Sequence, residues 1–121
     1  MALHTHDPRH IVSIMPLHGR LRVRFAGETV ALSTCAQIVS ETGLPDRYYV
    51  PAQDVTIALE GTSRRSTCPY KGGARYWTLP VGAHAAEDAA WSYDRPTPLA
   101  EPIRDHICFY DHIVRLEIEP A

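Results

Sequence analysis

The chain has 121 residues, a formal net charge of −2 and three cysteines. This length predicts one domain that buries roughly two-thirds of the surface exposed by its unfolded chain. Cys35, Cys68 and Cys108 are too widely spaced for a CxxC zinc motif or a disulfide framework, which indicates a reducing, cytoplasmic setting. The basic residues are scattered and no apolar run approaches the ~20 residues of a membrane span, so we expect neither nucleic acid nor a membrane as partner.

Residues 1–10 are polar and contain Pro8, which indicates a loose leader without a signal peptide, followed by one β domain over residues 11–119. Three histidines of the leader could ligate a metal only if their geometry were fixed: His4, His6 and His10. A surface tail is the simpler interpretation, so we expect no metal site. No cofactor is indicated.

Residues 11–14 can start a strand that Pro16 ends. Residues 21–25 alternate apolar and charged side chains, and residues 29–33 follow after a turn that contains Gly27, which predicts a β-hairpin. The apolar side of this hairpin should face the core with Leu21, Val23 and Phe25. The opposite side, with Arg20, Arg22 and Arg24, should be solvated.

Residues 34–41 fit two structures. Ser33 or Thr34 can cap a helix, but the apolar alternation and the β-branched residues also fit a strand. We choose a turn over residues 33–36 and a strand that ends at Glu41.

The rest of the chain predicts further short strands at residues 47–50, 55–59, 74–79, 89–93, 103–110 and 112–118. Polar or proline-rich loops should separate them at residues 61–67, 82–88 and 94–98. Many short strands with turn signals about every ten residues are typical of a mainly β fold. We expect a single compact antiparallel β domain, a roll or open barrel with little helix.

Residues 66–77 bring together a thiol, an ammonium group, aromatic rings and two glycines. The turn within this stretch consists of Cys68, Pro69, Tyr70, Lys71, Gly72 and Gly73. The proline fixes its own φ and favours an extended residue before it, and the glycines allow a positive φ or a close backbone approach. We therefore expect a tight turn that presents the tyrosine and the lysine before the next strand begins.

Cys68 and Lys71 each have a functional and a structural interpretation. As a nucleophile Cys68 needs its thiolate form, which Lys71 three residues later can stabilise. As a structural residue it is a small apolar group at a strand entrance. Lys71 can bind a carboxylate or phosphate as a point charge, or it can form an ion pair with Glu41 or Asp54.

Glu41 and Asp54 lie at the ends of predicted elements, where they can act as general acids or bases or simply form ion pairs. With Cys68 and Lys71 they complete the set of candidate catalytic residues. Aromatic residues dominate the cores of domains of this size, so at least half of them should be core. The candidates for ligand contact are Tyr49, Tyr70, Trp77, Trp91 and Tyr93.

Several short blocks occur in a characteristic order. They are Gly27-x-x-Val30-Ala31-x-Ser33-x-x-Ala36, Glu41, Tyr48-Tyr49-x-Pro51-x-x-Asp54-Val55, Cys68-Pro69-Tyr70-Lys71-Gly72, Tyr76-Trp77, Trp91-x-Tyr93 and Phe109-Tyr110. This pattern, over roughly residues 10–118, resembles the domain of unknown function 427 family, which also carries a nucleotidyltransferase-like label. The resemblance implies a compact, mostly β domain of Mss4-like or β-tent topology, and it implies little about activity.

Two positions depart from the family pattern. Leu32 stands where an acidic residue is common, and Gly73 stands where Asp or Glu is frequent, which leaves Lys71 without that nearby partner. The paired CxxC motifs with which Mss4-like relatives often bind zinc are absent from the sequence, so the metal does not carry over.

The leading hypothesis is a domain that binds a small anionic or aromatic ligand in an aromatic-lined pocket near residues 68–72. Lys71 would hold an anionic group, and Glu41 or Asp54 would handle protons. One alternative is an enzyme that uses Cys68 as nucleophile or transfers a nucleotidyl or phosphoryl group. Another is a non-catalytic interaction module, such as a homodimer joined through a strand edge.

Overall fold

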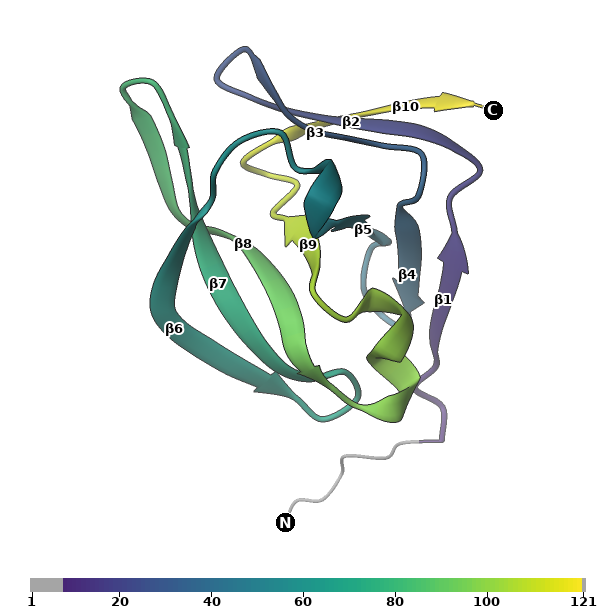
Figure 1. Ribbon diagram of the computed structural model, residues 1–121. Helices are drawn as coiled ribbons and strands as arrows, with labels where there is room; N and C mark the ends of the chain where they lie inside the picture. The colour runs from purple at the N-terminus through teal and green to yellow at the C-terminus, as the bar shows by residue number, and fades with distance from the viewer. Residues whose placement is uncertain (1–7, 121) are drawn as a thin grey trace.

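The computed structural model describes residues 8–120, so the predictions for His4 and His6 lie outside the described residues. The described part contains strands and two short 3-10 helices, η1 and η2 (Figure 1). In chain order they are β1 (Val12–Pro16), β2 (Gly19–Phe25), β3 (Glu28–Ser33), β4 (Gln37–Glu41), β5 (Arg47–Pro51), η1 (Ala52–Asp54), β6 (Glu60–Cys68), β7 (Gly72–Val81), β8 (His84–Pro96), η2 (Pro98–Ile103), β9 (His106–Phe109) and β10 (Arg115–Pro120).

The strands form two sheets. Seven of them make one sheet in the order β1-β4-β5-β9-β8-β7-β6, and the other three make a smaller sheet in the order β10-β2-β3. Neighbouring strands in both sheets run antiparallel, and the large sheet is not closed. The small sheet lies across one end of the large one (Figure 1). The prediction of a mainly β, antiparallel domain with little helix is confirmed.

The hairpin of β2 and β3 forms where the alternating pattern predicts it. Leu21 and Val23 are each 1% exposed, whereas Phe25 is half-buried and packs against the core. On the opposite face of the small sheet, ion pairs join β2 to its hydrogen-bonded neighbour β10, with Arg20 bound to Glu119 and Arg24 bound to Glu117. The alternation therefore separates core from surface as expected.

The ambiguity at residues 34–41 resolves as a turn and a strand. The backbone N–H of Cys35 donates to Oγ of Ser33 at 3.0 Å, which stabilises the turn. The next residues form β4, which pairs with β1 on one side and β5 on the other. The choice of a strand ending at Glu41 is confirmed, because two hydrogen-bonded neighbours satisfy its backbone.

Two predictions in the middle of the chain are wrong. Residues 55–59 alternate as a strand would, but only Val55 makes a β-bridge, to Ala31. Residues 61–67 were expected to be a loop because they are polar, yet they belong to β6, which pairs with β7. This strand is the edge of the large sheet and is mostly exposed, so apolar alternation is not required of it. Dimerisation through such an edge stays a prediction.

Strand boundaries in the last third of the chain also differ from expectation. The loop predicted at 82–88 is a tight turn, and β8 begins at His84 and continues to Pro96. A proline is tolerated there because it ends the strand, where no further ladder bond is needed. The strand predicted at 103–110 is shorter, because Ile103 closes η2 and Asp105 adopts a positive φ of 56° before β9.

The large sheet supports a core on each face, because successive residues of a strand point to opposite sides. One core lies between the sheets and includes Leu21, Val30, Leu79 and Phe109. The other contains four rings that we call the aromatic cluster: Tyr49, Tyr76, Trp91 and Tyr93. Ala100 and Ile103 of η2 pack against this cluster and are fully buried.

Candidate functional site

The turn between β6 and β7 holds a buried ion pair. Lys71 is only 8% exposed, and its ammonium group donates to the carboxylate of Glu41 at the end of β4. The two side chains are 10% and 7% exposed. The pair links strands near opposite edges of the large sheet, so the sheet must curl for the two side chains to meet. Of the alternatives for Lys71, the ion pair with Glu41 is the one that the structure contains.

His10 adds a second partner to this pair. Its Nε2 lies 2.8 Å from Oε2 of Glu41, and its ring stacks on Tyr70 with centroids 4.1 Å apart and planes 20° from parallel. His10 was expected to belong to a loose leader, yet it is half-buried against the domain. Burial by itself raises the pKa of Glu41, but hydrogen bonds from Lys71 and His10 outweigh it and hold the pKa below its usual value.

Three rings that were candidates for ligand contact are packed against one another in the aromatic cluster. Tyr49 is 1% exposed, Tyr93 is 7% exposed, and Nε1–H of Trp91 donates to the hydroxyl of Tyr49 at 3.1 Å. Burial raises the pKa of both tyrosines above the ordinary value. Cys68 is half-buried and packs against the same cluster. These rings are therefore core residues rather than the walls of an open pocket.

Trp77 and Asp54 lie apart from the Lys71–Glu41 pair. In the register of β7 and β8, Trp91 lies opposite Tyr76, so Trp77 faces the other side of the sheet. Asp54 ends η1 and accepts a hydrogen bond of 2.6 Å from the hydroxyl of Ser33. The structure thus brings Glu41 and Lys71 into contact and places Cys68 beside the nearby rings, while the other two residues serve other parts of the fold.

The three thiols should differ in alkylation rate by their exposure. Cys35 is exposed, Cys68 is intermediate and Cys108 is buried, and burial raises the pKa of the Cys108 thiol. With iodoacetamide at neutral pH, we expect modification in that order, with Cys108 protected until the protein unfolds. Peptide mass spectrometry over time measures the three rates. Faster labelling of Cys68 than of Cys35 would contradict this order and support the nucleophile hypothesis.

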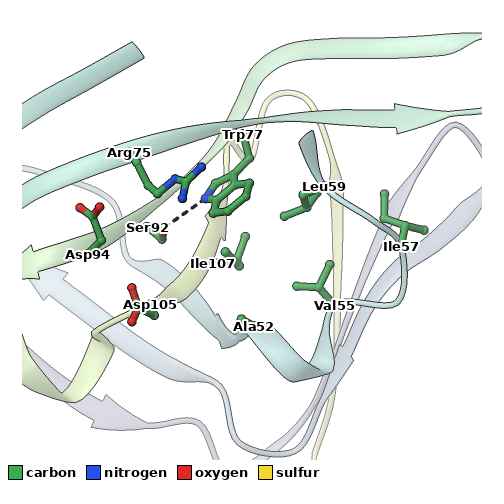
Figure 2. Close-up of a pocket in the computed structure, with 10 residues that line it drawn as sticks. All are labelled: Ala52, Val55, Ile57, Leu59, Arg75, Trp77, Ser92, Asp94, Asp105 and Ile107. Atoms are coloured by element: carbon green, nitrogen blue, oxygen red, sulfur yellow. Dashed lines mark hydrogen bonds between the residues drawn. The ribbon is translucent and has the colours of Figure 1, made fainter. Parts of the chain in front are cut away.

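The face of β7 and β8 opposite the aromatic cluster bears a hollow of about 370 Å³, which we call the Trp77 hollow (Figure 2). Its wall is mainly apolar and consists of Ala52, Val55, Ile57, Leu59, Trp77 and Ile107. Its polar lining consists of Arg75, Ser92, Asp94 and Asp105. In Figure 2 the two aspartates lie at one end and Val55, Ile57 and Leu59 lie at the other, so the hollow has a polar and an apolar end.

Trp77 is held by its neighbours. Its Nε1–H donates to the hydroxyl of Ser92 at 3.1 Å, and the guanidinium carbon of Arg75 lies 3.9 Å from the centre of its ring system. Gly61 on β6 makes room for this stack, since a Cβ there would overlap the Arg75 guanidinium and lie 3.5 Å from the indole. Within residues 8–120 Arg75 forms no ion pair, so its N–H groups stay available for an anion.

The sequence pattern places some of the lining residues of this hollow on a shared face. Arg75 and Trp77 are two apart in a predicted strand, so they share a face, and residues 55–59 show the same period. Asp105 has no such signal, because only a bridge between Tyr93 and Arg104 places it beside β8. Non-local pairing of this kind cannot be deduced from one sequence.

Across residues 8–120, no three His, Cys, Asp or Glu side chains gather as a metal site would require. In the same range, neither 3-10 helix is long or apolar enough to cross a lipid bilayer.

The fold and site define a small antiparallel β domain with a buried ion pair across its curled sheet and an open, mainly apolar hollow on the other face. The chain belongs to the family described as Domain of unknown function (DUF427), whose model matches residues 13–120. A comparison with curated proteins finds none that matches. The Mss4-like topology implied by the resemblance stays a prediction.

Proposed function

We propose that the protein is a cytoplasmic binding domain that takes up a small ligand with a planar, apolar body in the Trp77 hollow. The observation that carries this proposal is the hollow itself. Its volume of about 370 Å³ falls in the range of roughly 300–1,000 Å³ common for ligand sites. Its composition, an apolar wall with a few polar groups, also matches that of known sites.

The proposed ligand site differs in place from the one expected at residues 68–72. There Lys71 is bound to Glu41, and the neighbouring rings are packed against one another in the core. On the other face, Trp77 is partly exposed and offers an aromatic surface for stacking. These contacts therefore favour a ligand site in the Trp77 hollow over one at residues 68–72.

We do not propose group transfer, although the family carries a nucleotidyltransferase-like label. Nucleotidyl transfer normally needs carboxylates gathered around a divalent metal. Glu41 is bound to Lys71 and His10, and Asp54 is bound to Ser33, so these two carboxylates have separate partners.

Titration with 2-phenylethanol, a neutral aromatic probe, tests the proposal. The chain has two tryptophans, so a proton–nitrogen correlation spectrum shows two indole N–H signals, which a Trp77→Phe variant assigns. We expect the Trp77 signal to shift and saturate with added probe, because its ring lines the hollow. The Trp91 signal should stay in place, because that ring is 8% exposed and lies in the aromatic cluster.

A matched pair of leucine variants gives the control. Leu59→Ser removes part of the apolar wall and should weaken binding about threefold or more, as expected for the loss of a few buried methylene groups. Leu44→Ser changes a leucine that is 54% exposed and outside the hollow, and it should leave binding unchanged. A Trp77 signal that never shifts, or equal effects of the two variants, would overturn the proposal.

A further inference from the structure

The Trp77 hollow carries two charges of opposite sign that have no ion-pair partner within residues 8–120. One is the guanidinium of Arg75, stacked on the indole of Trp77. The other is the carboxylate of Asp105, at the polar end shown in Figure 2. The two groups are not paired with each other, because no ion pair of up to 4.0 Å joins them. Both residues line the same hollow, so a ligand bound there lies next to both.

The other charges near this end are already engaged. Asp94 binds Arg65 through two contacts, of 2.8 and 3.3 Å. Arg104, next to Asp105 in sequence, binds Glu101 at 2.9 Å and the backbone carbonyl of Asp94 at 3.3 Å. Within each of these pairs the two charges compensate each other. Arg75 and Asp105 therefore remain as the two groups that can select a ligand's charge.

We propose that the ligand is a zwitterion with an apolar body, of the chemical class of the aromatic α-amino acids. This inference rests on the proposed function and adds the charge pattern of the ligand. The carboxylate would bind Arg75, whose planar N–H edge suits a carboxylate. The ammonium group would bind Asp105, and the side chain would lie against Leu59 and Ile57 at the apolar end.

The small size of such a ligand limits the affinity with which the hollow can bind it. A ligand of about twelve non-hydrogen atoms that gains about 0.3 kcal/mol per atom has a dissociation constant on the order of 1 mM. Both charged contacts are partly solvated, so each should contribute about a threefold gain rather than a large one. The test therefore compares ligands with the same body and different charges.

Four probes with a phenyl body serve this comparison: phenylalanine, 3-phenylpropionate, 2-phenylethylamine and 2-phenylethanol. The Trp77 indole signal follows each titration. We expect phenylalanine to bind about threefold more tightly than either singly charged probe and about tenfold more tightly than the neutral one.

Two variants assign the charges to residues. Arg75→Gln should abolish the advantage of phenylalanine over 2-phenylethylamine, so that the two probes bind about equally tightly. Asp105→Asn should bring phenylalanine to the affinity of 3-phenylpropionate. Asparagine tolerates the positive φ of this position, so the second variant should fold. An unchanged Trp91 signal verifies the fold of both variants.

The outcomes separate the two proposals. Equal affinities for all four probes would overturn the zwitterion inference and leave binding in the hollow intact. Tighter binding of one singly charged probe than of phenylalanine would also overturn it. If none of the four shifts the Trp77 signal, both proposals fail.

Discussion

Replacing Glu41 with glutamine is expected to lower the free energy of unfolding by about 3 kcal/mol, because it leaves the buried ammonium group of Lys71 without a counter-charge. Both side chains of this pair are at most 10% exposed, so water cannot replace the lost partner. Urea denaturation at neutral pH, followed by tryptophan fluorescence, measures the change.

Two variants serve as controls for the expected effect of Glu41→Gln. Glu119→Gln removes the partner of Arg20 in an exposed pair, whose side chains are 56% and 45% exposed, and should change stability by less than about 1 kcal/mol. The double variant Glu41→Gln with Lys71→Met removes both charges and should recover much of the loss. If Glu41→Gln costs no more than Glu119→Gln, the pair is not the stabilising link that we infer.

The Lys71–Glu41 pair should make the free energy of unfolding depend on pH in the acidic range. The pKa of Glu41 in the folded protein is lower than its ordinary value of 4.5. The stabilisation is therefore fully present above that value and is lost as the pH falls through the lower, folded-state pKa. Between about pH 5 and pH 3, the wild type should lose more stability than Glu41→Gln, which has no carboxyl to protonate at this position. Parallel acid dependence of the two proteins would contradict this assignment.

Gly72→Ala is expected to lower the free energy of unfolding by about 3 kcal/mol, which combines backbone strain with steric overlap. Gly72 has a φ of 108°, a conformation that side chains rarely allow. A Cβ there would overlap the carbonyl oxygen of Arg95 and lie 2.8 Å from the backbone nitrogen of Thr97. Chemical denaturation of the purified variant measures the effect.

The adjacent glycine provides a matched control. Gly73 lies outside the left-handed region, and a Cβ there would meet the Cβ of Arg95 at 3.3 Å, a contact that a small shift relieves. Gly73→Ala should therefore cost less than about 1 kcal/mol. A loss at Gly73 as large as that at Gly72 would show that the strained φ is not the cause.

The sequence by itself determined the fold class and several local structures. Alternation over residues 21–25 predicted the hairpin and its buried face, because a strand must turn every second side chain to the core. The paired glycines predicted the tight turn before β7, because only glycine adopts the φ observed at Gly72 without strain. The buried partner of Lys71 was among the alternatives in the sequence as Glu41 or Asp54, and the structure contains Glu41.

Only the tertiary structure decided which residues share a face and a neighbour. The register of β7 against β8 separates Trp77 from Trp91, and the curl of the sheet brings Glu41 to Lys71. His10 and Asp105 took up their positions in the same way, through contacts with residues far along the chain or in another strand. Pairing between distant strands depends on the packing of the whole domain, so a local pattern of residues does not predict it.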